Sequence, residues 1–246
     1  MKAIILAGGK GTRLDEKDNP MPKVLRKACN KPLLGYVIDS ISYIDNQDIM
    51  LVVGYMYEEV INTFPNYRFI KQGGDGYGTG YALKCGYEAL GIGGHDGDIM
   101  VLQGDTPLVK SETLIKMCDE QKKQNNSCTL LSCVSQRSLP FGRIVRTDKG
   151  MVNKIVEEKN CTPEQKLIRE LNVGMYIFNS KDLKTALDKM KVNPISNEYY
   201  LTDIIEILYD DNKRVGAYIT GDETEMWGVN TLEDLMAVEE ILKNRK

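Results

Sequence analysis

A short glycine-rich stretch near the amino terminus carries charges suited to chemistry on phosphate. Residues 6–14 read LAGGKGTRL and follow the apolar run MKAII. Lys10 and Arg13 lie within this stretch, and Lys23 follows inside MPKVL. Backbone N–H groups of such a turn can hold an anion, and the three cations can offset the charge of a triphosphate. The stretch is therefore a candidate phosphate-binding loop, and a tight turn with solvated cations is the alternative.

Two common glycine motifs for phosphate do not fit this stretch. The dinucleotide pattern G-x-G-x-x-G fails because Leu14 stands where the third glycine is required. The pattern G-x-x-x-x-G-K-[ST] of P-loop proteins also fails. A redox cofactor and a P-loop nucleotide site are thus disfavoured. The only histidine, His95, lies in the glycine-rich segment GIGGHDGD and is interpreted as a solvated turn residue.

Composition narrows the class of partner. The 246 residues include 32 basic and 35 acidic ones, a net charge of −3, without long blocks of like charge. This balance disfavours a protein that binds nucleic acid or a membrane surface and favours a small-molecule partner. Six cysteines lack C-x-x-C spacing, and no apolar run is long enough for a signal peptide or a membrane span. We expect one domain in a reducing cytoplasm.

Apolar patterning predicts the elements that would position these groups. Short apolar runs alternate with segments of helical period, which indicates an α/β fold with a Rossmann-like, mainly parallel sheet flanked by helices. The expected strands cover residues 2–7, 49–54, 67–71, 98–104, 127–134, 173–179 and 215–220. The expected helices cover residues 33–44, 55–64, 79–90 and 111–124. Ligands should bind at the carboxyl ends of the strands.

The second half of the sequence is less regular. Residues 141–160 contain two apolar runs around Asp148-Lys149-Gly150, which predicts an antiparallel hairpin that could form a lip over a binding cleft. A last helix should start at Thr231, capped with Asp234 three residues on, and continue to the carboxyl terminus.

Several motifs in order resemble one enzyme family. LAGGKGTRL, MPKVL, GTGYAL, GDTPL, FGRIVR, IVEEKN, LNVGMYIF, NEYYLTDII and GVNT span nearly the whole chain. Together they are similar to the sugar-1-phosphate nucleotidylyltransferases, above all to the uridylyltransferase domain of bacterial UDP-N-acetylglucosamine pyrophosphorylases. The resemblance implies the fold of the nucleotide-diphospho-sugar transferases. It also implies a nucleotide-binding half at 1–110 and a sugar-binding half at 111–246 of the single domain.

The resemblance implies a reaction as well. A sugar-1-phosphate oxygen would attack the α-phosphorus of UTP, with pyrophosphate leaving and UDP-N-acetylglucosamine forming, so cations and a metal matter more than a general base. Asp105 and Asn230 would hold Mg²⁺, whose preferred ligands are oxygens. The catalytic cations would be Lys10, Arg13 and Lys23. The nucleotide would contact Leu6, Ala7, Gly8, Gly9, Gly11, Thr12, Gln72, Gly78 and Thr79. The sugar would contact Gly142, Glu157, Asn172, Tyr200 and Thr202.

Each assignment has a plainer alternative. Asp105 and Asn230 could serve as helix or turn caps, Glu157 could be a solvated surface carboxylate, and Tyr200 could belong to the core. Asn172 could lie in a strand-edge turn, and the glycines around Thr79 could form a flexible hairpin.

The sequence also departs from the family pattern. The glutamine that reads uracil should lie five residues before GTG, where Gly73 stands, with Gln72 one residue away. Either a local backbone shift brings Gln72 into place or base selectivity has changed. Gln103 replaces an aromatic residue before Gly-Asp. Another base or sugar (dTTP, CTP or glucose-1-phosphate) is the first alternative, and a non-catalytic domain that senses nucleotide sugars is the second.

One part of the bifunctional relatives is missing from this sequence. No hexapeptide repeats of an acetyltransferase follow residue 246, so we expect no acetyl-coenzyme A chemistry. The trimer that such repeats build should also be missing, which leaves a monomer or a dimer open.

Overall fold

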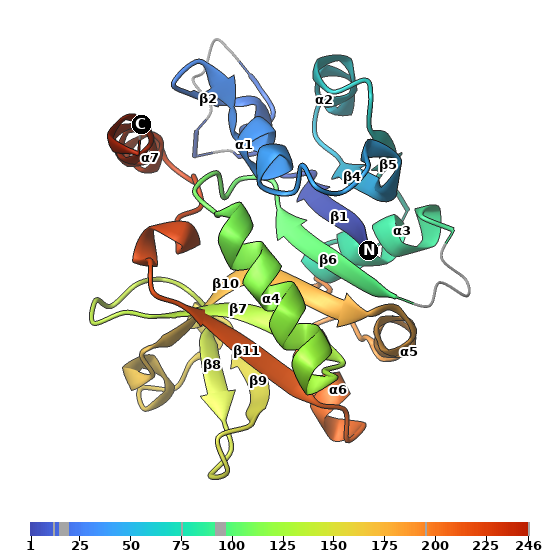
Figure 1. Cartoon of the computed structure of the whole chain (residues 1–246), viewed down its shortest axis with the longest axis vertical. Helices are drawn as coiled ribbons and strands as arrows, with labels where there is room; N and C mark the ends of the chain where they lie inside the picture. The colour runs from blue at the N-terminus through green and yellow to red at the C-terminus, as the bar shows by residue number, and fades with distance from the viewer. Residues whose placement is uncertain (12, 15–19, 75, 92–96, 195, 246) are drawn as a thin grey trace.

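A central sheet runs through both halves of the chain (Figure 1). The computed structural model describes residues 1–11, 13–14, 20–74, 76–91, 97–194 and 196–245. Within these residues the sheet has nine strands: β1 (Lys2–Ala7), β4 (Ile49–Val53), β5 (Arg68–Lys71), β6 (Asp98–Gln103), β7 (Cys128–Val134), β8 (Arg143–Arg146), β9 (Val152–Val156), β10 (Glu170–Asn179) and β11 (Val215–Thr220). A separate pair is formed by β2 (Lys27–Ala28) and β3 (Lys31–Pro32). All seven strands expected from apolar runs are present; β1 and β11 have the expected bounds, and no end of the other five is shifted by more than three residues.

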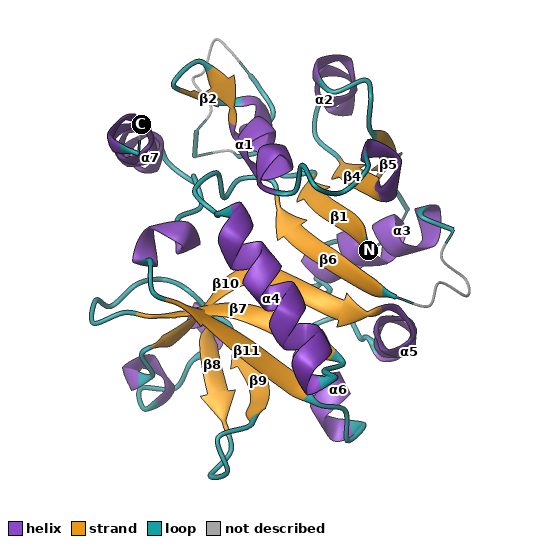
Figure 2. Cartoon of the chain, viewed as in Figure 1, coloured by secondary structure: helices purple, strands orange, loops and turns teal. Residues whose placement is uncertain are grey.

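Helices cover the two faces of this sheet (Figure 2). The α-helices are α1 (Leu33–Ser40), α2 (Tyr57–Thr63), α3 (Thr79–Ala89), α4 (Ser111–Gln124), α5 (Ser180–Lys189), α6 (Asp203–Asp210) and α7 (Leu232–Asn244). Short 3-10 helices are η1 (Lys23–Leu25), η2 (Asn46–Asp48), η3 (Glu158–Asn160), η4 (Gln165–Leu167) and η5 (Glu223–Met226). The sequence did not predict α5 and α6. At α7 the expected capping box is confirmed, with Asp234 N–H bound to the Thr231 hydroxyl.

Strand alternation divides the core into two layers. In β1, Ile5 packs with α1 and α4 on one face, whereas Ile4 packs with α3, α5 and α6 on the other. Figure 1 shows α4 crossing in front of the strands. Because both faces of β1 are buried, its sequence is an uninterrupted apolar run rather than an alternating one. A third cluster joins α7 to the β2–β3 pair.

One strand of the main path runs against the others. The order is β11-β7-β10-β6-β1-β4-β5, and β10 is antiparallel to both β6 and β7 while the remaining pairs are parallel. The predicted, mainly parallel sheet is confirmed. The reversal of β10 brings its first residues to the edge where β6 ends, as the hydrogen bond from Gln103 Nε2 to Gly174 O (3.3 Å) demonstrates.

The predicted hairpin is formed by β8 and β9, which pair in antiparallel register. The turn of this hairpin does not cover the pocket as a lip would. The open end, next to Gly142 and Glu157, lies toward the pocket described below. The turn, with Lys149 and Gly150, lines a different pocket beside α4 and β11. The reason is the pairing of β8 with the start of β10, which fixes the hairpin base at the carboxyl edge.

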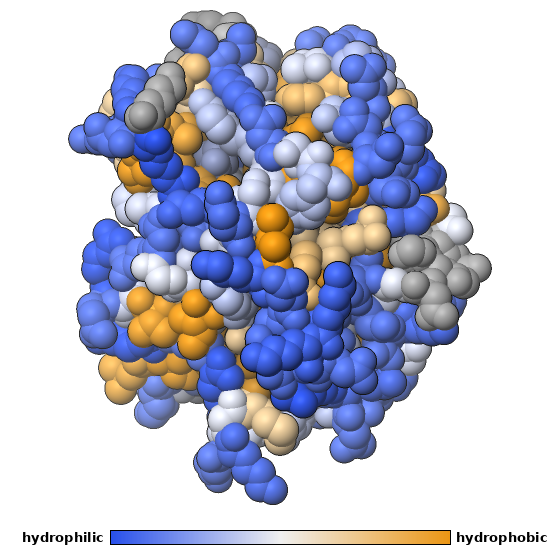
Figure 3. Space-filling view, viewed as in Figure 1, coloured by the Kyte–Doolittle hydropathy of each residue, from blue (hydrophilic) through white to orange (hydrophobic). Residues whose placement is uncertain are grey.

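The polarity of the surface, the length of the helices and the state of the cysteines bear on the predictions from composition. Figure 3 shows a face that is mostly hydrophilic, with apolar side chains gathered in a few places. In the part of the chain that the structure describes, no helix is both long and apolar enough to cross a membrane. All six cysteines are free thiols.

Candidate active site

The candidate site is a pocket of about 850 Å³ at the carboxyl ends of β1, β4 and β6. Its volume lies within the range of small-molecule sites. Eleven residues singled out from the sequence line it: Leu6, Gly8, Gly9, Lys10, Lys23, Gln72, Gly78, Thr79, Asp105, Glu157 and Tyr200. The lining does not include the predicted residues Ala7, Gly11, Arg13, Gly142, Asn172, Thr202 and Asn230. Thr12 lies outside the described residues.

Close approach of three backbone segments shapes the phosphate end of the pocket. Tyr55 N–H donates to Gly8 O (3.2 Å), and Gly104 N–H donates to Leu6 O (2.9 Å), so the loops after β1, β4 and β6 are joined. A side chain at Gly54 would place its Cβ 2.7 Å from Gly8 O, which only glycine avoids. Ala7 is fully buried in the core, so its side chain cannot contact a ligand in the pocket.

Two basic residues flank this end. The Lys10 ammonium lies 5.3 Å from the centre of the Tyr55 ring, at the rim of the pocket. Gly11 has φ +68° and lies against the Lys23 stem, where a Cβ would come within 2.8 Å of Lys23 Cβ. Gly11 therefore acts on the site through Lys23 rather than by lining the pocket.

Four side chains predicted for catalysis and metal binding converge next to the loop. The Lys23 ammonium forms an ion pair with Asp105 and donates to Asn230 Oδ1 at 2.8 Å. Arg13 Nη2 lies 3.5 Å from the same amide oxygen. Val229 N–H donates to Asp105 O (3.0 Å), which ties the two loops together. The helix cap at α7 is Thr231, so the side chain of Asn230 is left to face Lys23.

The oxygens around Lys23 could hold a metal ion. Asp105 and Asn230 both direct a side-chain oxygen at one ammonium, so the two oxygens already share a cation. A carboxylate and an amide, completed by water and phosphate oxygens, suit Mg²⁺. Within the described residues no group of three or more His, Cys, Asp or Glu is placed to hold a metal. The donor set therefore fits a cation shared with a phosphorylated ligand.

Gln72 lies in the pocket despite its offset in the sequence. Its side-chain oxygen is next to Gly8, and its Nε2 lies 3.4 Å from Gly78 O. Positive φ angles at Gly74 (+92°) and Gly78 (+102°) allow the intervening segment to turn. Gln72 thus lines the pocket, and its role in reading the base stays a prediction.

The start of α3 is fixed to the segment that precedes α6. Gly80 N–H donates to Tyr199 O (2.8 Å), and Tyr199 N–H donates to Tyr77 O (2.8 Å). The Thr79 hydroxyl accepts from Leu201 N–H (3.2 Å). A Cβ at Gly78 would lie 2.5 Å from Tyr199 O. This part of the pocket is a backbone clamp, not the flexible hairpin that the glycines allowed.

Glu157 and Thr202 meet at the opposite end of the pocket. The Thr202 hydroxyl donates to Glu157 Oε1 (2.9 Å), which orients this carboxylate and leaves its second oxygen available. Tyr200 lines the pocket and is also largely buried, and its contact with the sugar stays a prediction. Burial and the neighbouring carboxylates of Glu206 and Glu157 raise the pKa of Asp203 to about 6.

Asn172 and Gly142 lie beside this end without lining it. Asn172 Nδ2 donates to the Tyr176 hydroxyl (2.8 Å), and Asn172 Oδ1 accepts from Gly174 N–H (3.2 Å). Asn172 N–H donates to Gly142 O (2.8 Å). A Cβ at Gly142 would come within 2.9 Å of the Ile155 side chain, so this glycine is required for packing.

Several residues that line the pocket were not predicted from the sequence. Lys159 lies with its ammonium 4.9 Å from the centre of the Tyr200 ring, and a hydrogen bond with Tyr200 raises the pKa of this lysine. Glu198 and Tyr77 also line the pocket. Lys159 follows Glu157 by two residues in IVEEKN, so the motif itself contained this signal.

Solved structures share this architecture. A putative glucose-1-phosphate thymidylyltransferase from Bacillus anthracis superposes with a TM-score of 0.74, covering 98% of this chain and 94% of that one, at 19% identity. A UDP-glucose pyrophosphorylase complexed with UDP-glucose gives a TM-score of 0.75 over 100% and 99% of the two chains, at 18% identity. The chain thus shares the fold of these two proteins.

Sequence comparison identifies the family. The model of the MobA-like NTP transferase domain matches residues 3–174. The chain therefore belongs to the MobA-like NTP transferase domain family. It is also 42% identical over 245 residues to the bifunctional protein GlmU of Clostridium perfringens, and 42% identical over 244 residues to that of Clostridium novyi. The match covers 99% of this chain in both cases, and the chain spans about half (52%) of each relative.

Proposed function

We propose that this domain transfers a uridylyl group from UTP to N-acetylglucosamine-1-phosphate, giving UDP-N-acetylglucosamine and pyrophosphate. The observation that carries the proposal is the convergence of Lys23, Asp105, Asn230 and Arg13 beside a glycine-rich loop, where Lys23 and Asp105 line the pocket and Asn230 and Arg13 adjoin Lys23 or its partner oxygen. This grouping suits a reaction between two anions. The order of motifs and the membership in the NTP transferase family support it.

The proposed reaction is an in-line substitution at phosphorus. An oxygen of the sugar-1-phosphate forms a bond with the α-phosphorus of UTP as the bond to the β-phosphate oxygen breaks, and pyrophosphate leaves with that electron pair. In this arrangement Lys10 would contact the departing phosphates, and Arg13 and Lys23 would stabilise charge at the reacting phosphorus. The backbone of Gly8 and Gly9 would hold the triphosphate.

Asp105 and Asn230 are the proposed Mg²⁺ ligands. When bound, Mg²⁺ would neutralise phosphate charge and favour the in-line geometry. The ammonium of Lys23 interacts with both of these oxygens. We infer that Lys23 would turn toward the phosphates when the metal and the nucleotide bind together.

The sugar is proposed to bind at the other end of the pocket. Glu157, oriented by Thr202, can accept hydrogen bonds from two hydroxyls, and Tyr200 can pack against the ring. Lys159 is placed to contact an anionic group such as the sugar phosphate. Gly142 and Asn172 would act by supporting this end, because neither lines the pocket. The free thiols agree with a reducing, cytoplasmic location for the reaction.

Pyrophosphate release over a matrix of four triphosphates and several sugar-1-phosphates tests the proposal. We expect release with UTP, Mg²⁺ and N-acetylglucosamine-1-phosphate together, and none when any of the three is omitted. No release with any combination would overturn the proposal. Binding of UDP-sugar without turnover would indicate a sensing domain instead.

Arg13→Ala should lower kcat/KM by about 10²-fold, because it removes one donor of positive charge at the reacting phosphorus. Steady-state pyrophosphate release is the measurement. Lys27→Ala is the matched control, since Lys27 is an exposed cation on the neighbouring β2 strand. If Arg13→Ala left kcat/KM unchanged, Arg13 would have no part in the chemistry.

Gln72 is the proposed reader of the uracil base, because its side chain lines the pocket next to Gly8. We expect that Gln72→Ala will lower the preference for UTP over CTP by about 10-fold, because an amide that pairs with the base edge is lost. The ratio of kcat/KM for the two nucleotides is the measurement. Gln47→Ala, in the exposed η2 segment, should leave the ratio unchanged. A ratio that stays constant in Gln72→Ala would exclude Gln72 as the base reader.

A further inference from the structure

A buried arginine lies directly behind the proposed sugar end of the pocket. Arg143, the first residue of β8, is only 1% exposed. Its Nη1 donates to Phe141 O, and its Nη2 lies 2.7 Å from Glu158 Oε2. Lys166 Nζ approaches the other oxygen of Glu158 at 4.0 Å. One guanidinium thus joins the chain before β8 to the chain after β9.

Burying the Arg143 guanidinium costs free energy that its ion pair must offset. The Arg143 side chain is almost fully buried, whereas that of Glu158 is 33% exposed. Removing the guanidinium from water costs several kcal/mol, and an ion pair of this kind often stabilises no better than apolar side chains of similar volume. Arg143 Nε makes no hydrogen bond to any residue that the structure describes. A role in holding a particular geometry explains such a pair better than a contribution to stability does.

The two partners of Arg143 each adjoin a residue proposed to act on the sugar. Phe141 precedes Gly142, and Glu158 follows Glu157. Arg143 also pairs with Val156 across the hairpin, so the guanidinium closes the open end of β8 and β9. This open end is the part of the hairpin nearest to the pocket.

Neighbouring contacts extend this arrangement to the rest of the sugar end. Gly142 O accepts from Asn172 N–H (2.8 Å), and Glu157 Oε1 accepts from Thr202 (2.9 Å). The guanidinium therefore connects the three segments that bear Gly142, Glu157 and Asn172. A shift of Glu158 would move Glu157 directly, since adjacent Cα atoms are only about 3.8 Å apart.

We propose that the Arg143–Glu158 pair is a positioning device that sets the orientation of Glu157 toward the sugar. Neither residue lines the pocket or touches the reacting atoms. The pair acts on Glu157 through the backbone and leaves the phosphate loop unaffected. This inference rests on the proposed function, because it specifies how the sugar end of that same site is held.

The test uses Glu158→Gln and Arg143→Lys in the full chain. Glu158→Gln keeps volume but loses the charge, and Arg143→Lys keeps the charge but cannot reach both partners. We expect KM for N-acetylglucosamine-1-phosphate to rise about 10-fold or more in each variant, because misplacement by about 1 Å is costly. KM for UTP should change less than about 2-fold, since the phosphate loop is undisturbed.

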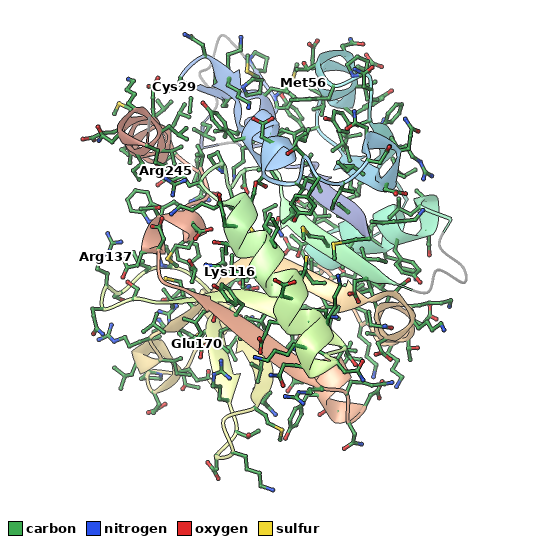
Figure 4. The ribbon with its side chains drawn as sticks, viewed as in Figure 1. Cys29, Met56, Lys116, Arg137, Glu170 and Arg245 are labelled. Atoms are coloured by element: carbon green, nitrogen blue, oxygen red, sulfur yellow. The ribbon has the colours of Figure 1, made fainter. Side chains whose placement is uncertain are left out.

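A matched ion pair on the same strand provides the control. Arg146 binds Glu170 through two hydrogen bonds of 2.7 Å each, away from the pocket (Figure 4 labels Glu170). Glu170→Gln should leave both KM values unchanged. If it raised KM for the sugar phosphate as much as Glu158→Gln does, the effect would be general loosening of the hairpin and the inference would be wrong.

Hydrogen exchange separates this inference from the proposed function. In the unliganded protein, Glu158→Gln should speed amide exchange in residues 157–161 and leave β4 unchanged. Unchanged exchange at 157–161 would overturn the positioning role, whatever the substrate. If the wild-type protein releases no pyrophosphate but Glu158→Gln still loosens this segment, the proposed function fails and the structural coupling stands. If the wild type is active and both KM values stay constant in the variants, the inference alone fails.

Discussion

Asp105→Asn is expected to reduce kcat/KM for uridylyl transfer by about 10³-fold, which corresponds to roughly 4 kcal/mol of lost transition-state stabilisation. Asp105 is the one carboxylate among the proposed metal ligands, and an amide in its place would leave only neutral protein oxygens around Mg²⁺. The substitution also removes the ion pair with Lys23. Steady-state pyrophosphate release over a range of Mg²⁺ concentrations is the measurement.

The control for Asp105→Asn lies at the other end of the same strand. Asp98 begins β6, and its carboxylate accepts a weak hydrogen bond from Gln121 (3.4 Å). Asp98→Asn should keep wild-type turnover. A thermal unfolding curve of Asp105→Asn should show that the fold is retained, since Asp105 is not part of the core. Wild-type kcat/KM in folded Asp105→Asn would rule out this residue as a metal ligand.

Lys23→Met should lower kcat/KM by about 10²- to 10³-fold, while it strengthens the binding of a divalent cation in the absence of nucleotide. The first effect follows from loss of a cation beside the phosphates. The second follows because the ammonium competes with a metal for the oxygens of Asp105 and Asn230. Methionine retains most of the side-chain volume next to Gly11.

Two measurements distinguish the two effects of Lys23→Met. Pyrophosphate release reports the loss of turnover, and Mn²⁺ binding followed by electron paramagnetic resonance reports the affinity of the unliganded protein for a cation. Lys27→Met, on the neighbouring strand, should change neither quantity. Weaker Mn²⁺ binding in Lys23→Met would contradict the competition, and unchanged turnover would exclude Lys23 from the reaction.

The strands could be predicted from the sequence because strands that are buried on both faces of the sheet consist of continuous apolar residues, as in β1 and β6. The antiparallel direction of β10 could not be predicted from the sequence. Residues 173–179 have the same apolar pattern whichever way the strand runs, and only pairing with β6 and β7 sets the direction. Helix α5 was missed although Asn179 caps it and Leu183, Ala186 and Leu187 have helical spacing.

Residues of the candidate site were predictable where the charge of the side chain by itself indicates a role. Lys23 and Asp105 could be selected because charged groups near a glycine-rich loop and at a strand end have few other uses. The environment of Asn172 could not be predicted, because its amide is held by Tyr176, four residues along the same strand. The place of Gln72 depends on its position directly after β5, where its N–H donates to Val53 O (2.8 Å), and spacing alone does not reveal this contact.

The hydrogen bond between Lys23 and Asn230 joins residues 207 positions apart in the chain. The proposed Mg²⁺ site therefore cannot form during synthesis until the segment before α7 has left the ribosome. A nascent chain already contains the whole glycine-rich loop and most of the sheet long before that moment. If the proposed metal site is correct, binding of a nucleotide with Mg²⁺ should require the segment before α7 and would report that this segment has joined the fold.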